Sequence, residues 1–381
     1  MARAKRKRKK QKQPMPAWAD ASLGIVLRSA LGLATAAPLD TTLAALESFG
    51  ARFARSRFNN RRRDTTMERI AFAFPDWTPD RVRECADGVW RHLFRMAGEV
   101  ALTGRMVRED SWMNQVRFDP VFRGLDDVLD GRPVVSVTAH LGSFEVIGPA
   151  LALLGVPMQA IYRPLDLRSV DRVVQQTRAG TGMRLVEKFG AMRRLPSILD
   201  TGAVPALVAD QNAGERGEFV PFFGRMTSTY KSVAAVAMRR NAVLVCGAVT
   251  RDLPPRSLGV DELHDAALER RRNSMAYTCR MIEAIRPEDW KDQPDPAFYI
   301  TARVRHNIER MVREAPEQYF WMHRVWKSRP AFEIERTGFP PELRDKLLAL
   351  PWMTPDAVGA IIEQSDADAA RLAKTGSRRF G

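Results

Sequence analysis

The sequence predicts an α/β protein with a central, largely parallel or mixed sheet flanked by helices, and with an N-terminal membrane-associated helix. From Pro133 onward, short apolar runs of strand character alternate with segments of helical spacing, the pattern of an α/β layer structure. An apolar segment near the N-terminus follows a strongly basic one. The chain has 381 residues and is 45% hydrophobic, so it can bury one large core or two modest ones.

The N-terminal region predicts a tail and an anchor. Residues 1–16 are expected to be a disordered basic tail, because "MARAKRKRKKQKQ" has eight Lys or Arg and no acid. Residues 17–47 are expected to contain the membrane-associated helix. The segment 21–39 would be about 28 Å long as a helix, close to the hydrocarbon thickness. Its single charge, Arg28, favours an interfacial or tilted helix over a clean span. An amphipathic core helix would show the same pattern.

The elements that follow are read from periodicity and turn residues. The arginine-rich stretch 52–63 suits a membrane surface, an acidic partner or a solvated helix face. Thr78 and Pro79 predict the start of an amphipathic helix. Strands are expected at "VVSVTAH", "VPMQAIYR", "VPALVAD" and "AVLVCGAVTR", with helices at "SVDRVVQQTRAG", "STYKSVAAVAMRR" and "PAFYITARVRHNIERMVREAP". "MAYTCRMIEAI" is a further candidate strand. Residues 48–330 are predicted to form the main domain, and 331–381 an extension of two short helices with a basic end.

Several classes of chemistry find no support in the motifs. The three cysteines, Cys85, Cys246 and Cys279, have no Cys-x-x-Cys spacing, so neither a disulfide framework nor a zinc ribbon is indicated. H-E-x-x-H, G-x-S-x-G and both glycine-rich nucleotide-binding motifs are absent from the sequence. We therefore expect no metal and no resident cofactor.

Polar residues follow three of the predicted strands. His140, Arg163 and Asp210 each stand at a strand end, and parallel strands end at one common edge where ligands bind. His140 is the best candidate general base, and Glu145 on the following helical turn could hold its tautomer. A histidine merely bonded to a backbone carbonyl is the alternative. Asp210 could equally cap the next segment.

Five blocks in order carry a family resemblance. "AHLGSFE" contains the H-x-x-x-x-[DE] signature of the glycerolipid acyltransferase superfamily. The chain most resembles its bacterial lauroyl and myristoyl lipid A acyltransferase branch, through "FNNRRRDTTMERIAFAFPDWTPDRV", "YRPLDL", "VADQN" with "FVPFFGRMTST", and "PEQYFWMHRVWKSRP". The resemblance covers most of the chain and implies a glycerolipid acyltransferase-like fold, with 48–330 as the acyltransferase domain.

The resemblance implies transfer of an acyl chain from a thioester carrier, usually acyl carrier protein, to a hydroxyl of a membrane glycolipid such as a lipid A precursor. It makes His140 the base and Glu145 its partner. It also places Arg178, Asp210 and, less strongly, Arg163 in the substrate site. The oxyanion needs donors such as a backbone N–H near Gly142 or a guanidinium. A basic surface suits an acidic carrier and an anionic membrane, at the cytoplasmic face of the inner membrane; no nucleic-acid partner is expected.

Other interpretations remain open at this point. Ser143 and Phe144 stand where the family commonly has Asn and Trp, and this departure leaves the identity of the acceptor open. The family resemblance does not explain the extension 331–381. Acyl coenzyme A could replace the carrier protein, with an ornithine lipid, a glycolipid or a lysophospholipid as acceptor. A basic membrane- or RNA-binding protein without catalysis is a third reading. "FVPFFG" fits either an acyl tunnel wall or core packing, and His323 is read as structural.

Overall fold

The computed structural model describes residues 37–119, 124–164, 182–188, 190–251 and 275–376, with isolated positions between 16 and 32 and at 171 and 175. The predicted N-terminal tail, except Pro16, and about half of the apolar segment 21–39 lie outside these residues, whereas 40–47 are described as part of a helix. Arg178 and most of the helix predicted at "SVDRVVQQTRAG" also lie outside the described residues. Among the helices described, none is both long enough and apolar enough to cross a membrane.

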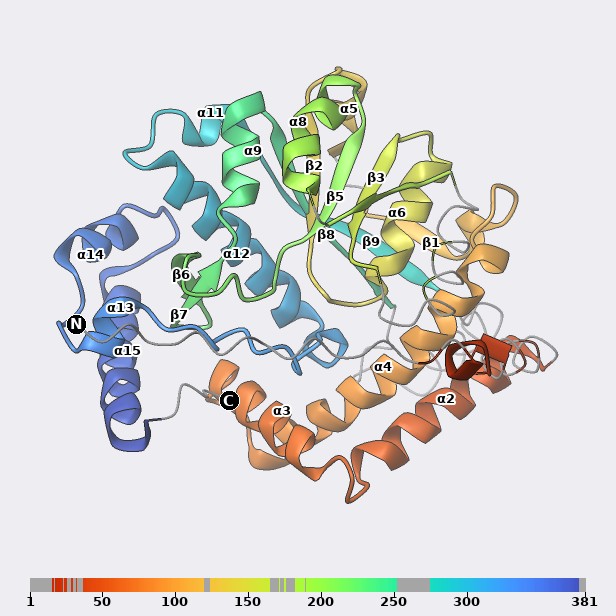
Figure 1. Cartoon of the computed structure of the whole chain (residues 1–381), viewed down its shortest axis with the longest axis horizontal. Coiled ribbons are helices and arrows are strands. Elements are labelled where there is room, and N and C mark those ends of the chain that lie inside the picture. Colours follow the sequence, from red (N-terminus) through yellow and green to blue (C-terminus); the bar gives the residue numbers. More distant parts are fainter. Residues whose placement is uncertain are drawn as a thin grey trace, which may run out of the picture.

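A seven-stranded sheet forms the centre of the molecule (Figure 1). Its order is β1-β9-β8-β2-β5-β3-β4, and all pairs are parallel except β8 with β9. The predicted α/β class is therefore confirmed. The strands are β1 (Val116–Phe118), β2 (Val134–Thr138), β3 (Met158–Tyr162), β4 (Arg184–Glu187), β5 (Val204–Val208), β8 (Val243–Arg251) and β9 (Tyr277–Ile285).

Helices cover both faces of the sheet. Helix α6 packs on β3 and β8, whereas α8, α9 and α12 cover the opposite face. This burial on both faces is why all five residues of β2 are buried, and four of the five are β-branched. The helices described in this part of the chain are α5 (Gly124–Leu129), α6 (Phe144–Leu153), α8 (Ala191–Asp200), α9 (Ser232–Arg240), α11 (Pro287–Trp290) and α12 (Pro296–Glu314).

From Leu39 onward, three described helices precede the sheet and pack together along one side of it (Figure 1). They are α2 (Leu39–Ala54), α3 (Asn60–Ala73) and α4 (Pro79–Met106). Helix α4 begins as predicted, with the Thr78 side chain accepting the Arg81 N–H and Pro79 in the first turn. Two short 3₁₀ helices lie at Trp112–Asn114 and Pro316–Gln318.

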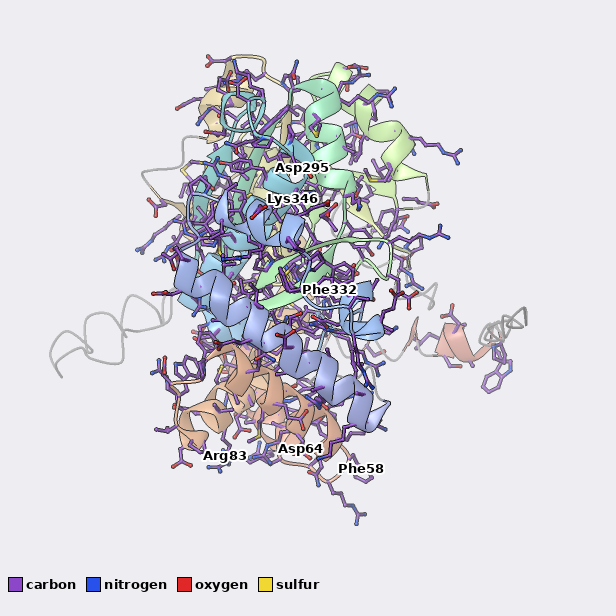
Figure 2. All side chains as sticks on the ribbon, turned by 90° about the vertical axis from the view of Figure 1, so that its left-hand side faces the viewer. Phe58, Asp64, Arg83, Asp295, Phe332 and Lys346 are labelled. Carbon is purple, nitrogen blue, oxygen red and sulfur yellow. The ribbon has the colours of Figure 1, made fainter. Side chains whose placement is uncertain are left out.

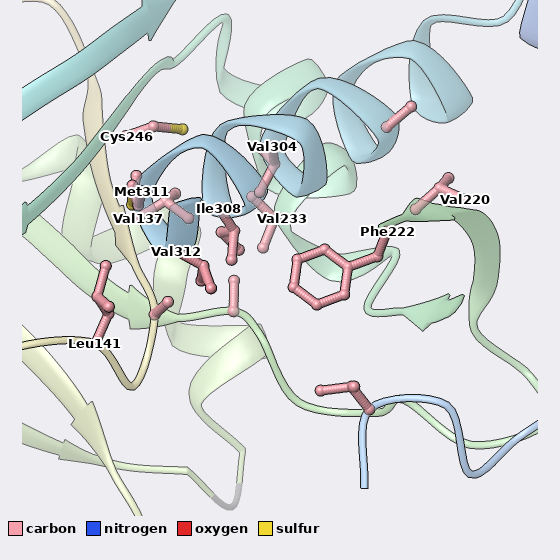
Figure 3. Packing of buried hydrophobic residues seen from close by; sticks show 14 of the residues in the cluster. Val137, Leu141, Val220, Phe222, Val233, Cys246, Val304, Ile308, Met311 and Val312 are labelled. Atoms are coloured by element: carbon pink, nitrogen blue, oxygen red, sulfur yellow. The ribbon is translucent and has the colours of Figure 1, made fainter. Parts of the chain in front are cut away.

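The segment "FVPFFGRMTST" forms an antiparallel hairpin of β6 (Glu218–Phe222) and β7 (Arg225–Thr229). Figure 3 shows how Val220 and Phe222 of this hairpin pack beside Val304 and Ile308 of α12. Phe222 is fully buried in the same hydrophobic cluster as Val137 of β2. The hairpin is therefore core packing, the second of the two readings left open for "FVPFFG".

The C-terminal part corrects the expectation of two short helices. It contains α13 (Ala331–Glu335), α14 (Pro341–Leu348) and α15 (Pro355–Thr375), the last with 21 residues. Helix α15 packs on α13, α14 and strand β7. The Lys346 ammonium of α14 also contacts the Asp295 carboxylate before α12 at 2.8 Å (Figure 2).

Candidate functional site

The loop between β2 and α6 holds His140 in place by backbone hydrogen bonds. The His140 carbonyl accepts the Phe320 N–H at 2.9 Å, and the Ser143 N–H donates to the Val249 carbonyl at 2.8 Å. Gly142 has a φ of +58°, and a Cβ there would collide with the Val249 carbonyl oxygen. Only glycine fits this turn, so the Gly after the strand places the preceding histidine.

Asp210 orients the His140 imidazole. Its Oδ1 lies 2.7 Å from His140 Nδ1, and its Oδ2 accepts the His140 backbone N–H at 3.1 Å. The two residues meet because β2 and β5 are parallel neighbours, with Thr138 paired to Val208. With Nδ1–H donated to the carboxylate, Nε2 is the nitrogen left to accept a proton.

The carboxyl group of Asp210 is fully buried. Burial alone would raise its pKa, but the nearby His140, His323 and Arg305 side chains outweigh burial and lower the pKa to about 2. Arg305 also donates its Nη1–H to the Asp210 carbonyl oxygen at 2.8 Å. Asp210 is therefore an ionised partner for His140 at neutral pH.

The other residues predicted for the site have different places. Glu145 is in the first turn of α6 and Arg163 directly follows β3, and both line the same cavity as His140. The contact at Nδ1, which sequence reasoning assigned to Glu145, belongs to Asp210 in the structure. The Gly142 N–H donates to the Gln318 carbonyl at 3.0 Å, so it is not aimed at an oxyanion. Arg178 lies outside the described residues.

The cavity beside His140 has a volume of about 400 Å³ and a mostly apolar lining. Its polar lining residues are Thr138, His140, Glu145, Arg163, Lys188, Gln211, Tyr230 and Ser232. Its remaining lining comes from β3, β5, α6 and the starts of α8 and α9, and includes Ile147, Gly148, Ala160, Ile161, Met183, Met192, Ala206, Leu207 and Val233. An apolar chamber with a base at its edge suits a ligand with a long hydrocarbon part.

A buried polar network under the loop was not foreseen from the sequence. Glu99 of α4 accepts hydrogen bonds from Ser143 Oγ and Arg251 Nη1, each at 2.7 Å. Arg251 also contacts His92, and Gln318 Oε1 accepts the Arg251 N–H at 3.0 Å. The network explains why a small hydroxyl residue suits position 143. Its sequence signal is the set of polar residues His92, Arg95, Glu99 and Thr103, which recur at helical spacing along one face of α4.

His323 was read as structural, yet it lies against His140. The two ring centroids are 4.4 Å apart, and His323 Nδ1 is 3.9 Å from Asp210 Oδ2. One atom from each of His140, Asp210 and His323 falls within 4.8 Å of the other two, a donor set that could take a metal ion. However, the 2.7 Å between His140 Nδ1 and Asp210 Oδ1 is a hydrogen-bond distance, shorter than two ligands of one ion require.

Three histidines make the fold sensitive to acid. Burial lowers the pKa of His323 to about 4, that of His92 well below its usual value, and that of His306 in the same direction. The unfolded chain binds protons at these imidazoles near pH 6.5, whereas the folded chain resists doing so. The free energy of unfolding should therefore fall as the pH drops from about 6.5 to about 4.

Urea unfolding at a series of pH values tests this expectation. Between pH 6.5 and 4, the free energy of unfolding should fall by up to about 3 kcal/mol less in a His323→Phe variant than in the unchanged protein. Comparing slopes instead of absolute values removes any change in packing at pH 7. A variant with the same slope as the unchanged protein would contradict the buried, neutral state of His323.

Comparison with known proteins identifies the family of this chain. The family described as "Bacterial lipid A biosynthesis acyltransferase" matches residues 6–261. A "Lipid A biosynthesis acyltransferase" of Haemophilus influenzae is 21% identical over 277 residues, 71% of this chain and 77% of the relative. A "Lipid A biosynthesis palmitoleoyltransferase" of Escherichia coli is 27% identical over 215 residues, 55% of this chain and 62% of the relative. The chain therefore belongs to the bacterial lipid A biosynthesis acyltransferase family and is an acyltransferase.

Proposed function

We propose that this protein is a membrane-associated O-acyltransferase that moves a fatty acyl chain from an acyl thioester, carried by acyl carrier protein, to a hydroxyl of a lipid A precursor. The observation that carries the proposal is the His140–Asp210 pair at the edge of an apolar cavity. A base alone would suit many reactions, and a hydrocarbon-sized chamber alone would suit a binding protein. Their combination favours acyl transfer to a hydroxyl.

In the proposed mechanism, Nε2 of His140 removes the proton of the acceptor hydroxyl as its oxygen attacks the thioester carbonyl carbon. Asp210 stabilises the imidazolium that forms. The tetrahedral oxyanion then collapses, the carbon–sulfur bond breaks, and His140 returns the proton to the leaving thiol. An ester and a free thiol result, so atoms and charges balance.

Cationic groups at the cavity edge are proposed to bind the charged parts of the substrates. Arg163 and Lys188 follow the adjacent parallel strands β3 and β4, and the Lys188 N–H donates to the Tyr162 carbonyl at 2.7 Å. A guanidinium here can stabilise the oxyanion or a substrate phosphate. Glu145, lining the same cavity, is proposed to act beside His140, and Arg178 stays a candidate from the family motif.

The apolar lining is proposed to hold the acyl chain, with Met183 limiting its length. Met183 is buried, lines the cavity and packs on Gly148, where a Cβ would collide with its sulfur. Met183→Ala should improve use of an acyl chain about two carbons longer than the preferred one, by roughly tenfold relative to that chain.

Competition between acyl donors of different length measures this preference. Met192→Ala is the matched control, because Met192 lines the same cavity but is 40% exposed. An unchanged preference in Met183→Ala, or an equal change in both variants, would place the length limit elsewhere.

An exposed corner between α2 and α3 supports membrane association. The stretch from Ser48 to Arg63 has six arginines and no acid, and Phe49 and Phe58 are 55% and 83% exposed. Figure 2 places Phe58 at the outer edge of the helical layer that precedes the sheet. Arginines that alternate with exposed aromatic rings suit an anionic lipid surface. We call this the Arg/Phe corner; its exposed members are Phe49, Arg52, Arg55, Arg57, Phe58, Arg61 and Arg62.

Reversing two charges at the Arg/Phe corner should weaken binding to vesicles that contain an anionic lipid. Each arginine near such a surface contributes about 1 kcal/mol, so Arg57→Glu with Arg61→Glu should lower affinity at least about thirtyfold. The control, Arg216→Glu with Arg344→Glu, makes the same charge change at exposed sites outside the corner. If both pairs of substitutions lower vesicle affinity equally, the effect comes from net charge and not from the position of the arginines. A chain lacking residues 1–40 tests the predicted anchor separately.

The deciding experiment measures the reaction directly. Purified protein in detergent is incubated with acyl carrier protein that bears defined chains and with a lipid extract containing lipid A precursors. Mass spectrometry identifies acylated products, with His140→Ala as the control. A mass gain on a precursor that the variant lacks supports the proposal. A mass gain on another lipid would show that the proposed acceptor is wrong, and a gain only with acyl coenzyme A would show that the proposed donor is wrong. If neither donor gives a product, the proposal is overturned.

A further inference from the structure

The chain segment after the second 3₁₀ helix runs directly past the base. Tyr319 forms an isolated bridge with Leu141, and the Phe320 N–H donates to the His140 carbonyl at 2.9 Å. His323, three residues later, presents its ring edge-to-face to the His140 ring, with 68° between the ring planes. The same backbone contacts that hold His140 therefore also hold His323 beside it.

The Asp210 carboxylate faces both imidazoles. One oxygen, Oδ1, accepts from His140 Nδ1 at 2.7 Å, and the other, Oδ2, is 3.9 Å from His323 Nδ1. His323 Nδ1 is buried and has no hydrogen-bond partner in the described structure. Buried polar atoms are nearly always paired, so an unpaired one that faces a carboxylate calls for an explanation.

The charges around His323 favour its neutral form. Asp210 faces it after β5 and His140 faces it after β2, while Arg305 of α12 and Arg69 of α3 add positive charge nearby. Burial and these cations lower the pKa of His323 to about 4, although Asp210 opposes them. A neutral imidazole can donate from Nδ1 without repelling the imidazolium that forms at His140.

We propose that His323 is a positioning residue for the reaction. Its neutral Nδ1–H supports Oδ2 of Asp210, and it thereby keeps the carboxylate ionised and directed at His140 while His140 takes up a proton. As His140 takes up the proton, His323 Nδ1 moves from 3.9 Å to hydrogen-bond distance of Asp210 Oδ2. This inference rests on the proposed function, because the role is exercised during proton transfer.

Two substitutions separate donation from packing. His323→Phe keeps a ring and loses the donor, whereas His323→Asn places an amide N–H near the position of Nδ1. We expect kcat to fall about thirtyfold in His323→Phe with KM for the acyl donor unchanged, and to stay within about threefold in His323→Asn. The acid limb of the pH profile of kcat/KM should move to higher pH only in His323→Phe. In that variant the Asp210 carboxylate no longer shares its negative charge with a donor on residue 323, so it favours the protonated form of His140 more strongly. His306→Phe is the control, since that half-buried histidine stacks on Trp352.

A spectroscopic readout keeps the test independent of turnover. The His140 Nδ1 proton bonded to Asp210 should give a distinct ¹H NMR signal in histidine-labelled protein. That signal should shift in His323→Phe and stay in place in His323→Asn and His306→Phe. If both His323 variants lose the same fraction of kcat, and neither the acid limb of kcat/KM nor the NMR signal shifts, then His323 contributes only by packing. Absence of transfer by the unchanged protein would instead refute the proposed function, while the signal would still report on the His323–Asp210–His140 arrangement.

Discussion

Replacing His140 with alanine is expected to lower acyl transfer by about 10³-fold while leaving the protein folded. His140 is half-buried at the cavity edge and ends a strand without filling the core, so its loss removes a base and little packing. Steady-state transfer from acyl carrier protein measures the rate, and circular dichroism with urea unfolding checks the fold. Turnover close to that of the unchanged protein would exclude His140 as the base.

The two nearby carboxylates should behave differently in the same assay. Asp210→Asn presents an amide N–H to Nδ1, which forces the proton onto Nε2 and blocks the base, so transfer should fall about 10²- to 10⁴-fold. Glu145→Ala is also expected to abolish transfer, but without changing the tautomer. The NMR signal of the His140 Nδ1 proton should therefore vanish in Asp210→Asn and persist in Glu145→Ala. Its loss in Glu145→Ala instead would return the orienting role to Glu145.

The second large effect concerns stability. Removing the Asp368 carboxylate should lower the free energy of unfolding by about 3–5 kcal/mol. Asp368 on α15 is buried between Arg225 of β7 and Arg329, with nitrogen–oxygen distances of 2.8 and 2.9 Å. Arg329 has no exposed side-chain surface and also pairs with Glu333 at 2.6 Å. Asp368→Ala therefore removes the carboxylate that two buried guanidinium groups share.

Urea unfolding of Asp368→Ala beside Asp366→Ala measures this effect. Asp366 is exposed two residues earlier on the same helix, so its removal should change stability by no more than about 0.5 kcal/mol. Equal stability of the two variants would show that the ionic cluster contributes nothing net. The expected difference would show that helices α13 to α15, for which the sequence offered no account, complete the charge balance of the hairpin.

Local patterns predicted the parts of the fold that depend on local physics. The β-branched run before His140, the Thr-Pro start of α4 and the spacing of α12 each identify one element, because strand burial and helix capping act over a few residues. The expectation that strand ends converge also held for His140 and Asp210, since parallel strands share a carboxyl edge. By contrast, the hairpin β6–β7 and the long helix α15 were not predicted.

The pairing inside the site could not be read from the chain. His140 and Asp210 are 70 positions apart, and Glu145, only five residues from His140, was the obvious partner on sequence distance. The register of β2 against β5 decides that Asp210 reaches Nδ1. Likewise, Glu99 and His323 reach the loop only because α4 and the segment after α12 pack against it.

By itself, then, the sequence determined the α/β class, the histidine at a strand end and the motifs that identify the acyltransferase family. The tertiary structure decided which carboxylate orients this histidine, which buried groups hold its loop and which second imidazole stands beside it. The physical reason is the distance along the chain over which each interaction acts. Strand and helix periodicities are short-range properties of the chain, whereas the ionisation and orientation of buried groups depend on neighbours brought together by packing.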